Sequence, residues 1–212
     1  ILFKSYESLK VSDKIVSASA TARITETNYQ FLSSSGSEIE QDFLIIGSAF
    51  DAVSQDKGIT QRRTDNGRGR MFQSGYEVFD EAKLTSMCKT IGEQAVELLY
   101  ADECPTETTN LVLAPDQMLL QIHESIGHPL EVDRILGDER NYAGWSFVRE
   151  EDFGNLKYGS DIMNITFDPT IKKELASYGF DDSGKKAEKK YIIKDGILLR
   201  GLGGTESEQR SG

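Results

Sequence analysis

The chain has 212 residues, of which 38% are hydrophobic and 28% charged, a balance typical of a soluble globular protein with one large domain or two small ones. Its net charge of −11 at pH 7 argues against nucleic-acid binding, which needs a basic surface for the phosphates. No apolar run approaches membrane-spanning length, so no membrane association is expected. Two cysteines are too few for a disulfide scaffold and favour a reducing, cytoplasmic location.

Both ends of the chain look cut. It begins at Ile1 without a methionine, shows no signal peptide, and ends on a polar run with glycine at 203–212. We therefore expect an interior piece of a longer protein, in which the missing targeting segment says little about location.

The first part of the chain predicts a meander of antiparallel strands. Ile1–Val11 is short and mixed, and we expect a strand there. From Val16 to Ile24 apolar and polar residues alternate, which predicts a strand with one buried face. Ile59–Thr64 is expected to pair back onto the strand before it. The strand before it consists of two runs, Phe43–Ile46 and Ala49–Val53. Gly47 lies between these runs and is expected to mark a bulge.

Asp80–Tyr100 predicts a long amphipathic helix, because apolar residues recur at spacings of three and four. Cys88 lies on this apolar stripe and is expected in the core. Cys104 follows in a polar connection, where we expect it to be more exposed. A provisional boundary at Cys104–Asn110 separates an N-terminal α/β region, 1–104, from a second region, 105–212, which we expect to be truncated.

The second region opens with a predicted strand, Leu111–Ala114, and a helix for which Asp116 is the expected N-cap. Leu119 lies four residues before His123 and is expected to pack beneath it. The helix carries the only two histidines of the chain, in the stretch His123-Glu124-Ser125-Ile126-Gly127-His128. Imidazole is a common zinc ligand, and a carboxylate beside a zinc-bound water is the usual general base of a metal hydrolase.

The spacing of the two histidines differs by one residue from the zinc-protease pattern H-E-x-x-H. On a regular helix, residues five apart point roughly 140° away from each other. Either the helix contains a π-bulge or it ends before His128. Gly127 and Pro129 favour an end, because glycine often terminates helices and proline disfavours helical backbone in the residue before it.

Other interpretations of this stretch stay open. The histidines are either metal ligands or ordinary residues near a helix end. Glu131 and Asp133 are candidates for a third ligand, for acceptors of an imidazole N–H, or for solvated acids around Arg134. Asn141–Phe147 is either a substrate-facing loop or a packed loop, and the sequence assigns no substrate-binding residue.

The last part predicts a strand at Ile162–Phe167, a short helix at Lys172–Tyr178, and a hairpin with Asp195-Gly196 at its turn. The strands of the hairpin are expected at Tyr191–Ile193 and Ile197–Leu199. Together these patterns predict an α+β fold: an antiparallel sheet region with a long amphipathic helix, then a motif-bearing helix and further antiparallel strands.

The segment HESIGHPLEVDRILGDERNYAGWSF, 123–147, resembles the signature of the TldD/PmbA family of zinc peptidases. Tyr178–Gly184 and Tyr191–Gly204 are similar to the downstream block of that family. The presence of both histidines points to the TldD-like branch. The resemblance implies that His123 and His128 bind zinc and that Glu124 activates water. It also implies a third ligand, a cysteine beyond Gly212, whereas the two cysteines of this chain precede the motif.

Two main functional hypotheses follow, and a third keeps the metal but changes the reaction to the hydrolysis of another amide or of an ester. The first is a zinc-dependent metallopeptidase acting on small or unfolded peptides. Here the resemblance also implies a homodimer or a heterodimer with a TldE/PmbA-like subunit. With two protein ligands, the 212-residue piece alone is expected to be inactive and largely metal-free. The second hypothesis is a non-catalytic peptide-binding or assembly subunit. It requires histidines too far apart to share an ion, or a site closed by four protein ligands.

Overall fold

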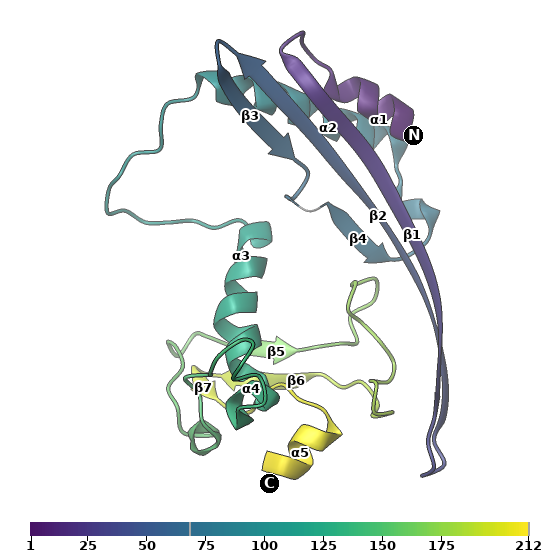
Figure 1. Ribbon diagram of the computed structural model, residues 1–212, viewed down its shortest axis with the longest axis vertical. Coiled ribbons are helices and arrows are strands. Elements are labelled where there is room, and N and C mark those ends of the chain that lie inside the picture. The colour runs from purple at the N-terminus through teal and green to yellow at the C-terminus, as the bar shows by residue number, and fades with distance from the viewer. Residues whose placement is uncertain (68, 212) are drawn as a thin grey trace. The chain divides into compact units, whose positions relative to one another are not determined.

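The computed structural model describes residues 1–67 and 69–211, and shows an α+β protein with helices and antiparallel sheets, as the sequence predicts (Figure 1). The chain forms two compact units, which are described separately. The first comprises Ile1–Gln30, Glu40–Thr109 and Lys172–Ser177, and the second comprises Phe31–Ile39, Asn110–Ile171 and Tyr178–Gly212.

The sheet of the first unit has the order β1-β2-β3, and β4 also pairs with β2. The strand bounds are β1 Ile15–Leu32, β2 Glu38–Asp56, β3 Ile59–Thr64 and β4 Arg70–Gln73. The strands predicted after residue 15 are therefore present, but the bulge predicted at Gly47 is wrong. Gly47 pairs with Met71 in regular register, and a Cβ there would lie 2.5 Å from the carbonyl oxygen of Arg70. The glycine instead allows β4 to approach β2 closely.

Two helices cover one face of this sheet: α1, Leu2–Leu9, and α2, Glu81–Glu97 (Figure 1). The helix predicted at Asp80–Tyr100 is confirmed. Asp80 caps α2 by accepting a hydrogen bond from the Lys83 amide at 3.0 Å, and a 3-10 turn, η2 (Leu98–Tyr100), extends the helix. The core between helices and sheet contains these buried residues: Leu9, Phe50, Ala52, Leu84, Cys88, Ile91 and Ala95.

The strand predicted at Ile1–Val11 is wrong, because most of this segment forms α1. Leu2, Ser5 and Leu9 face the core at helical spacing. Since the middle position of that row is the polar Ser5, hydrophobicity alone does not reveal the period.

The second unit has an antiparallel sheet of β5 (Ile165–Phe167), β6 (Lys190–Lys194) and β7 (Ile197–Leu198). The β6–β7 hairpin confirms the sequence prediction. Asp195 and Gly196 have φ of 49° and 76°, the left-handed conformation that a type I′ hairpin turn requires at both of its central residues. The core of this unit includes residues of β6 and β7 and consists of these buried residues: Ile126, Leu130, Val148, Ile192, Ile193 and Leu198.

The motif helix α3 spans Pro115–Ile122, with Ala114 as N-cap and Pro115 in the first helical position. Asp116 lies inside the first turn, so its predicted role as N-cap is wrong. The strand predicted at Leu111–Ala114 is also absent from the described chain, where this stretch is irregular and Val112 is 93% exposed. An apolar run becomes a strand only when a neighbouring strand accepts its backbone hydrogen bonds.

The helix predicted at Lys172–Tyr178 is wrong, since the segment consists of turns with Lys173 at φ 71°. The remaining helical elements are short: η1 Tyr76–Val78, η3 His123–Gly127, η4 His128–Leu130, α4 Val132–Leu136, η5 Glu150–Asp152 and α5 Thr205–Ser211. None of the described helices is long and apolar enough to cross a membrane.

Substitution of Gly92 tests the packing of α1 on α2. A Cβ at this position would lie 2.3 Å from the Leu9 carbonyl oxygen. Alanine favours a helix by about 1 kcal/mol over glycine, but overpacking costs about 1–3 kcal/mol. We expect Gly92→Ala to lower the free energy of unfolding, measured by urea denaturation. Thr90→Ala, at an exposed position of the same helix, is the control. A Gly92→Ala variant more stable than the wild type would contradict the packing.

The two cysteines are expected to differ in reactivity. Burial raises the pKa of the Cys88 thiol to about 11, so Cys88 stays protonated and shielded at mildly alkaline pH. Cys104 is exposed. We expect iodoacetamide to alkylate Cys104 in the native protein and Cys88 only after denaturation, as mass spectrometry of peptides would show. Equal labelling of both thiols in the native protein would contradict the burial of Cys88 in this core.

Candidate metal centre

The motif helix contains a π-turn between the two histidines. After α3 the chain continues into the π-helix η3, His123–Gly127, where the backbone N–H of His128 donates to the carbonyl of His123, five residues earlier. Gly127 and His128 both keep right-handed helical backbone angles. The prediction that the helix ends before His128 is therefore wrong, and the alternative that contains a π-bulge is correct. Turns of this kind are rare in proteins, and those that do occur are often found at functional sites.

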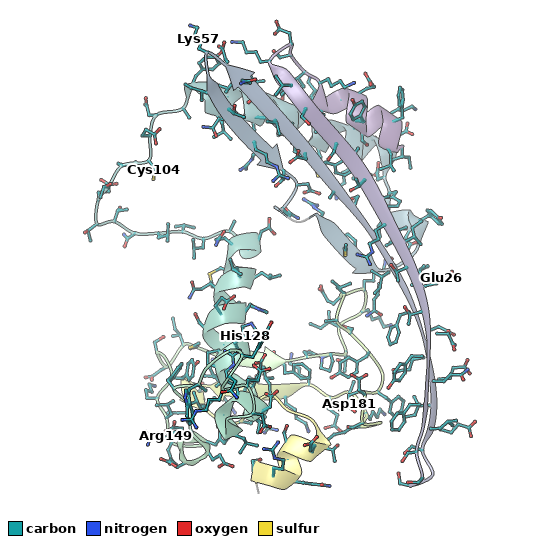
Figure 2. The ribbon with its side chains drawn as sticks, in the orientation of Figure 1. Glu26, Lys57, Cys104, His128, Arg149 and Asp181 are labelled. Carbon is teal, nitrogen blue, oxygen red and sulfur yellow. The ribbon has the colours of Figure 1, made fainter. Side chains whose placement is uncertain are left out.

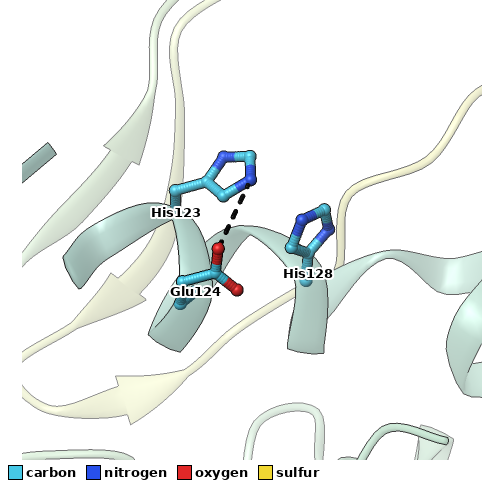
Figure 3. Close-up of side chains that lie close together, drawn as sticks. All are labelled: His123, Glu124 and His128. Carbon is cyan, nitrogen blue, oxygen red and sulfur yellow. Dashed lines mark ion pairs between the residues drawn. The ribbon is translucent and has the colours of Figure 1, made fainter. Parts of the chain in front are cut away.

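The π-turn brings the two imidazoles to one side of the helix. Their ring centroids lie 4.3 Å apart with the planes at 77°. Figure 3 shows Glu124 beside them, with its Oε1 4.0 Å from His123 Nε2. One ligand atom from each of the three side chains lies within 4.8 Å of the other two. The structure thus brings together the three residues that the sequence singles out.

The opposite face of the turn fixes this orientation. Ile126 and Leu130 are 5% and 0% exposed and belong to the core of the second unit. The side chains of His123 and Glu124 are 54% and 61% exposed, and that of His128 is 34% exposed. Because the two apolar residues are anchored in the core, the two imidazoles and the carboxylate point outward.

A carboxylate holds the second nitrogen of His128. His128 Nδ1 lies 2.9 Å from Glu131 Oε1, and Glu131 Oε2 lies 3.6 Å from Arg134 Nε. Arg134 in turn pairs with Glu139 at 3.2 Å. An ionised Glu131 accepts the Nδ1 proton, which leaves the lone pair of the neutral ring on Nε2, available to a metal. Of the roles left open for Glu131, the structure favours the imidazole acceptor.

One further expectation about the site is wrong. Leu119 is 72% exposed and does not pack beneath His123, because the face of α3 that carries it is turned outward. Asp133 accepts a hydrogen bond from the Arg134 amide instead of joining the three clustered residues. The predictions for the two cysteines are confirmed: Cys104 is exposed in the irregular segment between α2 and α3 (Figure 2), and Cys88 lies in the core of the first unit. Neither cysteine belongs to the cluster found in the described chain.

Two contacts to the motif were not expected from the sequence. The Tyr158 hydroxyl donates to the Ser125 carbonyl at 2.6 Å, and the Ser146 hydroxyl donates to the Pro129 carbonyl at 2.5 Å. The sequence contains one signal for the contact with Ser125. Proline at position 129 has no N–H, so the carbonyl four residues earlier needs another donor.

The donor set fits a zinc ion. Two imidazoles with an adjacent carboxylate are the side chains found at catalytic zinc sites. Ligand atoms on a tetrahedral zinc lie about 3.4 Å apart, which follows from zinc–nitrogen bonds of about 2.1 Å. The separations here are up to 4.8 Å, so a small change in the side-chain torsion of the exposed His123 would bring the ligand atoms to the spacing that zinc requires.

Comparison with known proteins gives consistent results. Residues 106–212 match the family described as PmbA/TldA metallopeptidase C-terminal domain. Named metalloproteases of Methanothermobacter thermautotrophicus and Methanocaldococcus jannaschii are 29% and 27% identical over 94% and 99% of this chain. The chain spans only 41% and 44% of their lengths. A Metalloprotease TldD homolog of Buchnera aphidicola is 27% identical over 72% of this chain and 31% of its own.

Solved structures show the same fold. A protein named as a candidate modulator of DNA gyrase from Thermotoga maritima has a TM-score of 0.75 at 16% identity, over 100% of this chain and 46% of that one. TldE from Thermococcus kodakarensis has a TM-score of 0.61 at 15% identity, over 94% and 42% of the two chains. The profile match covers half of the chain and confirms the resemblance carried by the motif: the chain belongs to the PmbA/TldD family of metallopeptidases.

Proposed function

We propose that the protein is a zinc-dependent metallopeptidase that hydrolyses peptide bonds, with His123 and His128 as zinc ligands and Glu124 as general base. The observation that carries the proposal is the π-turn, which presents these three side chains on one side of a helix with ligand atoms within 4.8 Å. Membership of a metallopeptidase family supports the same conclusion.

The roles follow from the chemistry of the side chains. When bound, zinc lowers the pKa of a coordinated water to about 7 and polarises the scissile carbonyl. Glu124 is adjacent to the first ligand, where its carboxylate takes the proton of the attacking water and delivers it to the leaving amine. Glu131 keeps the His128 ring in one orientation and in the tautomer that binds through Nε2.

The proposal extends to parts of the protein beyond this chain. The chain spans less than half the length of the relatives it matches. We propose that the family cysteine supplies the third ligand, that peptides or unfolded polypeptides are the substrates, and that the protein works in the cytoplasm. We further propose that it pairs with a second copy or with a TldE/PmbA-like subunit.

The non-catalytic alternative has less support. It requires either histidines too far apart to share an ion or a site closed by four protein ligands. The ring centroids are 4.3 Å apart, and the described cluster contains only three candidate ligand residues. The short distance between the rings argues against the first of these requirements, and no fourth candidate ligand lies in the described cluster.

A test of Glu124 separates metal binding from catalysis. We expect the full-length protein and its Glu124→Gln variant to bind about one zinc per chain by mass spectrometry, because Glu124 is not a ligand. Peptide cleavage should fall by about 10²–10⁴-fold in the variant, the usual contribution of a general base. Glu151→Gln, at an exposed position of the same unit, is the control. Absence of zinc in metal-replete wild-type protein, or full cleavage by Glu124→Gln, would refute the proposal.

A test of Glu131 concerns zinc affinity. Removing the charge that accepts the Nδ1 proton weakens the preference for the tautomer that binds through Nε2. We expect Glu131→Gln to lower zinc affinity by about tenfold in chelator competition, the size of effect typical of outer-shell partners. The Glu151→Gln control should bind zinc like the wild type. Unchanged affinity in Glu131→Gln would show that this hydrogen bond does not prepare the ligand.

A further inference from the structure

The π-turn contains a carbonyl that lacks its usual hydrogen-bond donor. In a regular helix the Ser125 carbonyl would accept from the amide of residue 129. That residue is Pro129, which has no N–H. The unpaired carbonyl lies between the two proposed ligands in sequence, at the place where the helix takes its extra residue.

The hydroxyl of Tyr158 replaces the missing donor. It lies 2.6 Å from the Ser125 oxygen, and the tyrosine side chain is half-buried. Burial raises the pKa of Tyr158, so the hydroxyl stays protonated and able to donate. A hydrogen bond from outside the helix therefore reaches the backbone of the π-turn itself.

The β6–β7 hairpin holds Tyr158 in place. The Tyr158 amide donates to the Gly196 carbonyl at 2.8 Å, and the neighbouring Lys157 pairs with Ile197. A Cβ at Gly196 would lie 2.5 Å from the carbonyl oxygen of Gly159, so this approach requires a glycine. The Tyr158 hydroxyl is thus fixed by a turn that is far away in sequence.

Ser146 makes a second contact just beyond the π-turn. Its hydroxyl donates to the Pro129 carbonyl at 2.5 Å and accepts from the Val148 amide at 2.9 Å. Val148 is 2% exposed in the core of the second unit. The two hydroxyls therefore attach carbonyls on either side of His128 to rigid parts of the unit.

We propose that Tyr158 is a positioning residue of the metal centre: with help from Ser146, its hydroxyl stabilises the π-turn that places His123 and His128 on one side of the helix. In this role Tyr158 touches neither the metal nor the substrate and acts only through the backbone of the π-turn. Its effect on zinc affinity rests on the proposed function, whereas its effect on the π-turn does not. A regular helix is the competing conformation, in which the same histidines point roughly 140° apart.

The test compares Tyr158→Phe with the wild type in the full-length protein. The variant keeps the ring and removes only the donor. Tyr142→Phe is the matched control, because Tyr142 is 94% exposed. We expect Tyr158→Phe to bind zinc about tenfold more weakly in chelator competition, as outer-shell losses do. In metal-free protein, hydrogen exchange of a peptide covering 123–131 should be several-fold faster, with the thermal midpoint close to that of the wild type.

The outcomes are distinguishable. Zinc affinity within about twofold of the wild type, or weaker binding without faster exchange, would overturn the proposal. Loss of global stability with unchanged zinc affinity would also overturn it, since that result indicates an ordinary structural contact. If the wild type binds no zinc but Tyr158→Phe still exchanges faster, the proposed function fails and the role of Tyr158 in the π-turn stands. Ser146→Ala should change both measurements in the same direction by a smaller factor.

Discussion

The site depends on one constraint, which is that two residues five apart must share a side of a helix. A regular turn of 3.6 residues cannot do this, whereas a turn closed by an i→i+5 hydrogen bond contains the extra residue. The bond from the His128 amide to the His123 carbonyl is that closure. It brings the imidazoles together while Ile126 and Leu130 stay in the core. One backbone feature therefore orients both the histidines on the exposed face and the apolar side chains on the buried face.

This turn is not stabilised by local preferences. A π-turn is rare, Gly127 is a poor helix former, and Pro129 disfavours helical backbone at His128 and removes a donor. The stabilisation comes from tertiary contacts. Burial of each of the two apolar side chains contributes about 1.5–3 kcal/mol, and each hydroxyl–carbonyl hydrogen bond adds about 1 kcal/mol. Conflict between local preference and global fold is expected at functional sites, where geometry is maintained against the intrinsic tendency of the chain.

The contrast between local preferences and tertiary contacts also explains which elements of the structure the sequence predicts correctly. The alternation at Val16–Ile24, the apolar stripe of Asp80–Tyr100 and the Asp195-Gly196 turn are local signals, and all three elements form. The stretches at 1–11, 111–114 and 172–178 were assigned wrongly, because their conformation depends on partners elsewhere in the chain. At the site, residue types and spacing identify His123, Glu124 and His128. The predicted helix end is wrong because the local preferences of Gly127 and Pro129 are outweighed by the burial of Ile126 and Leu130 in the core.

The geometry also limits how the proposed coordination is completed. A carboxylate that accepts the Nδ1 proton of an imidazole lies on the opposite side of the ring from a metal at Nε2, so Glu131 cannot serve both purposes for His128. Asp133 is turned to the backbone of its own helix. Within the described residues the cluster thus offers two imidazoles and the base. A catalytic zinc usually has three protein ligands, so the proposed third must come from outside this cluster. The exposure of His123 and Glu124 leaves that side of the site accessible to it.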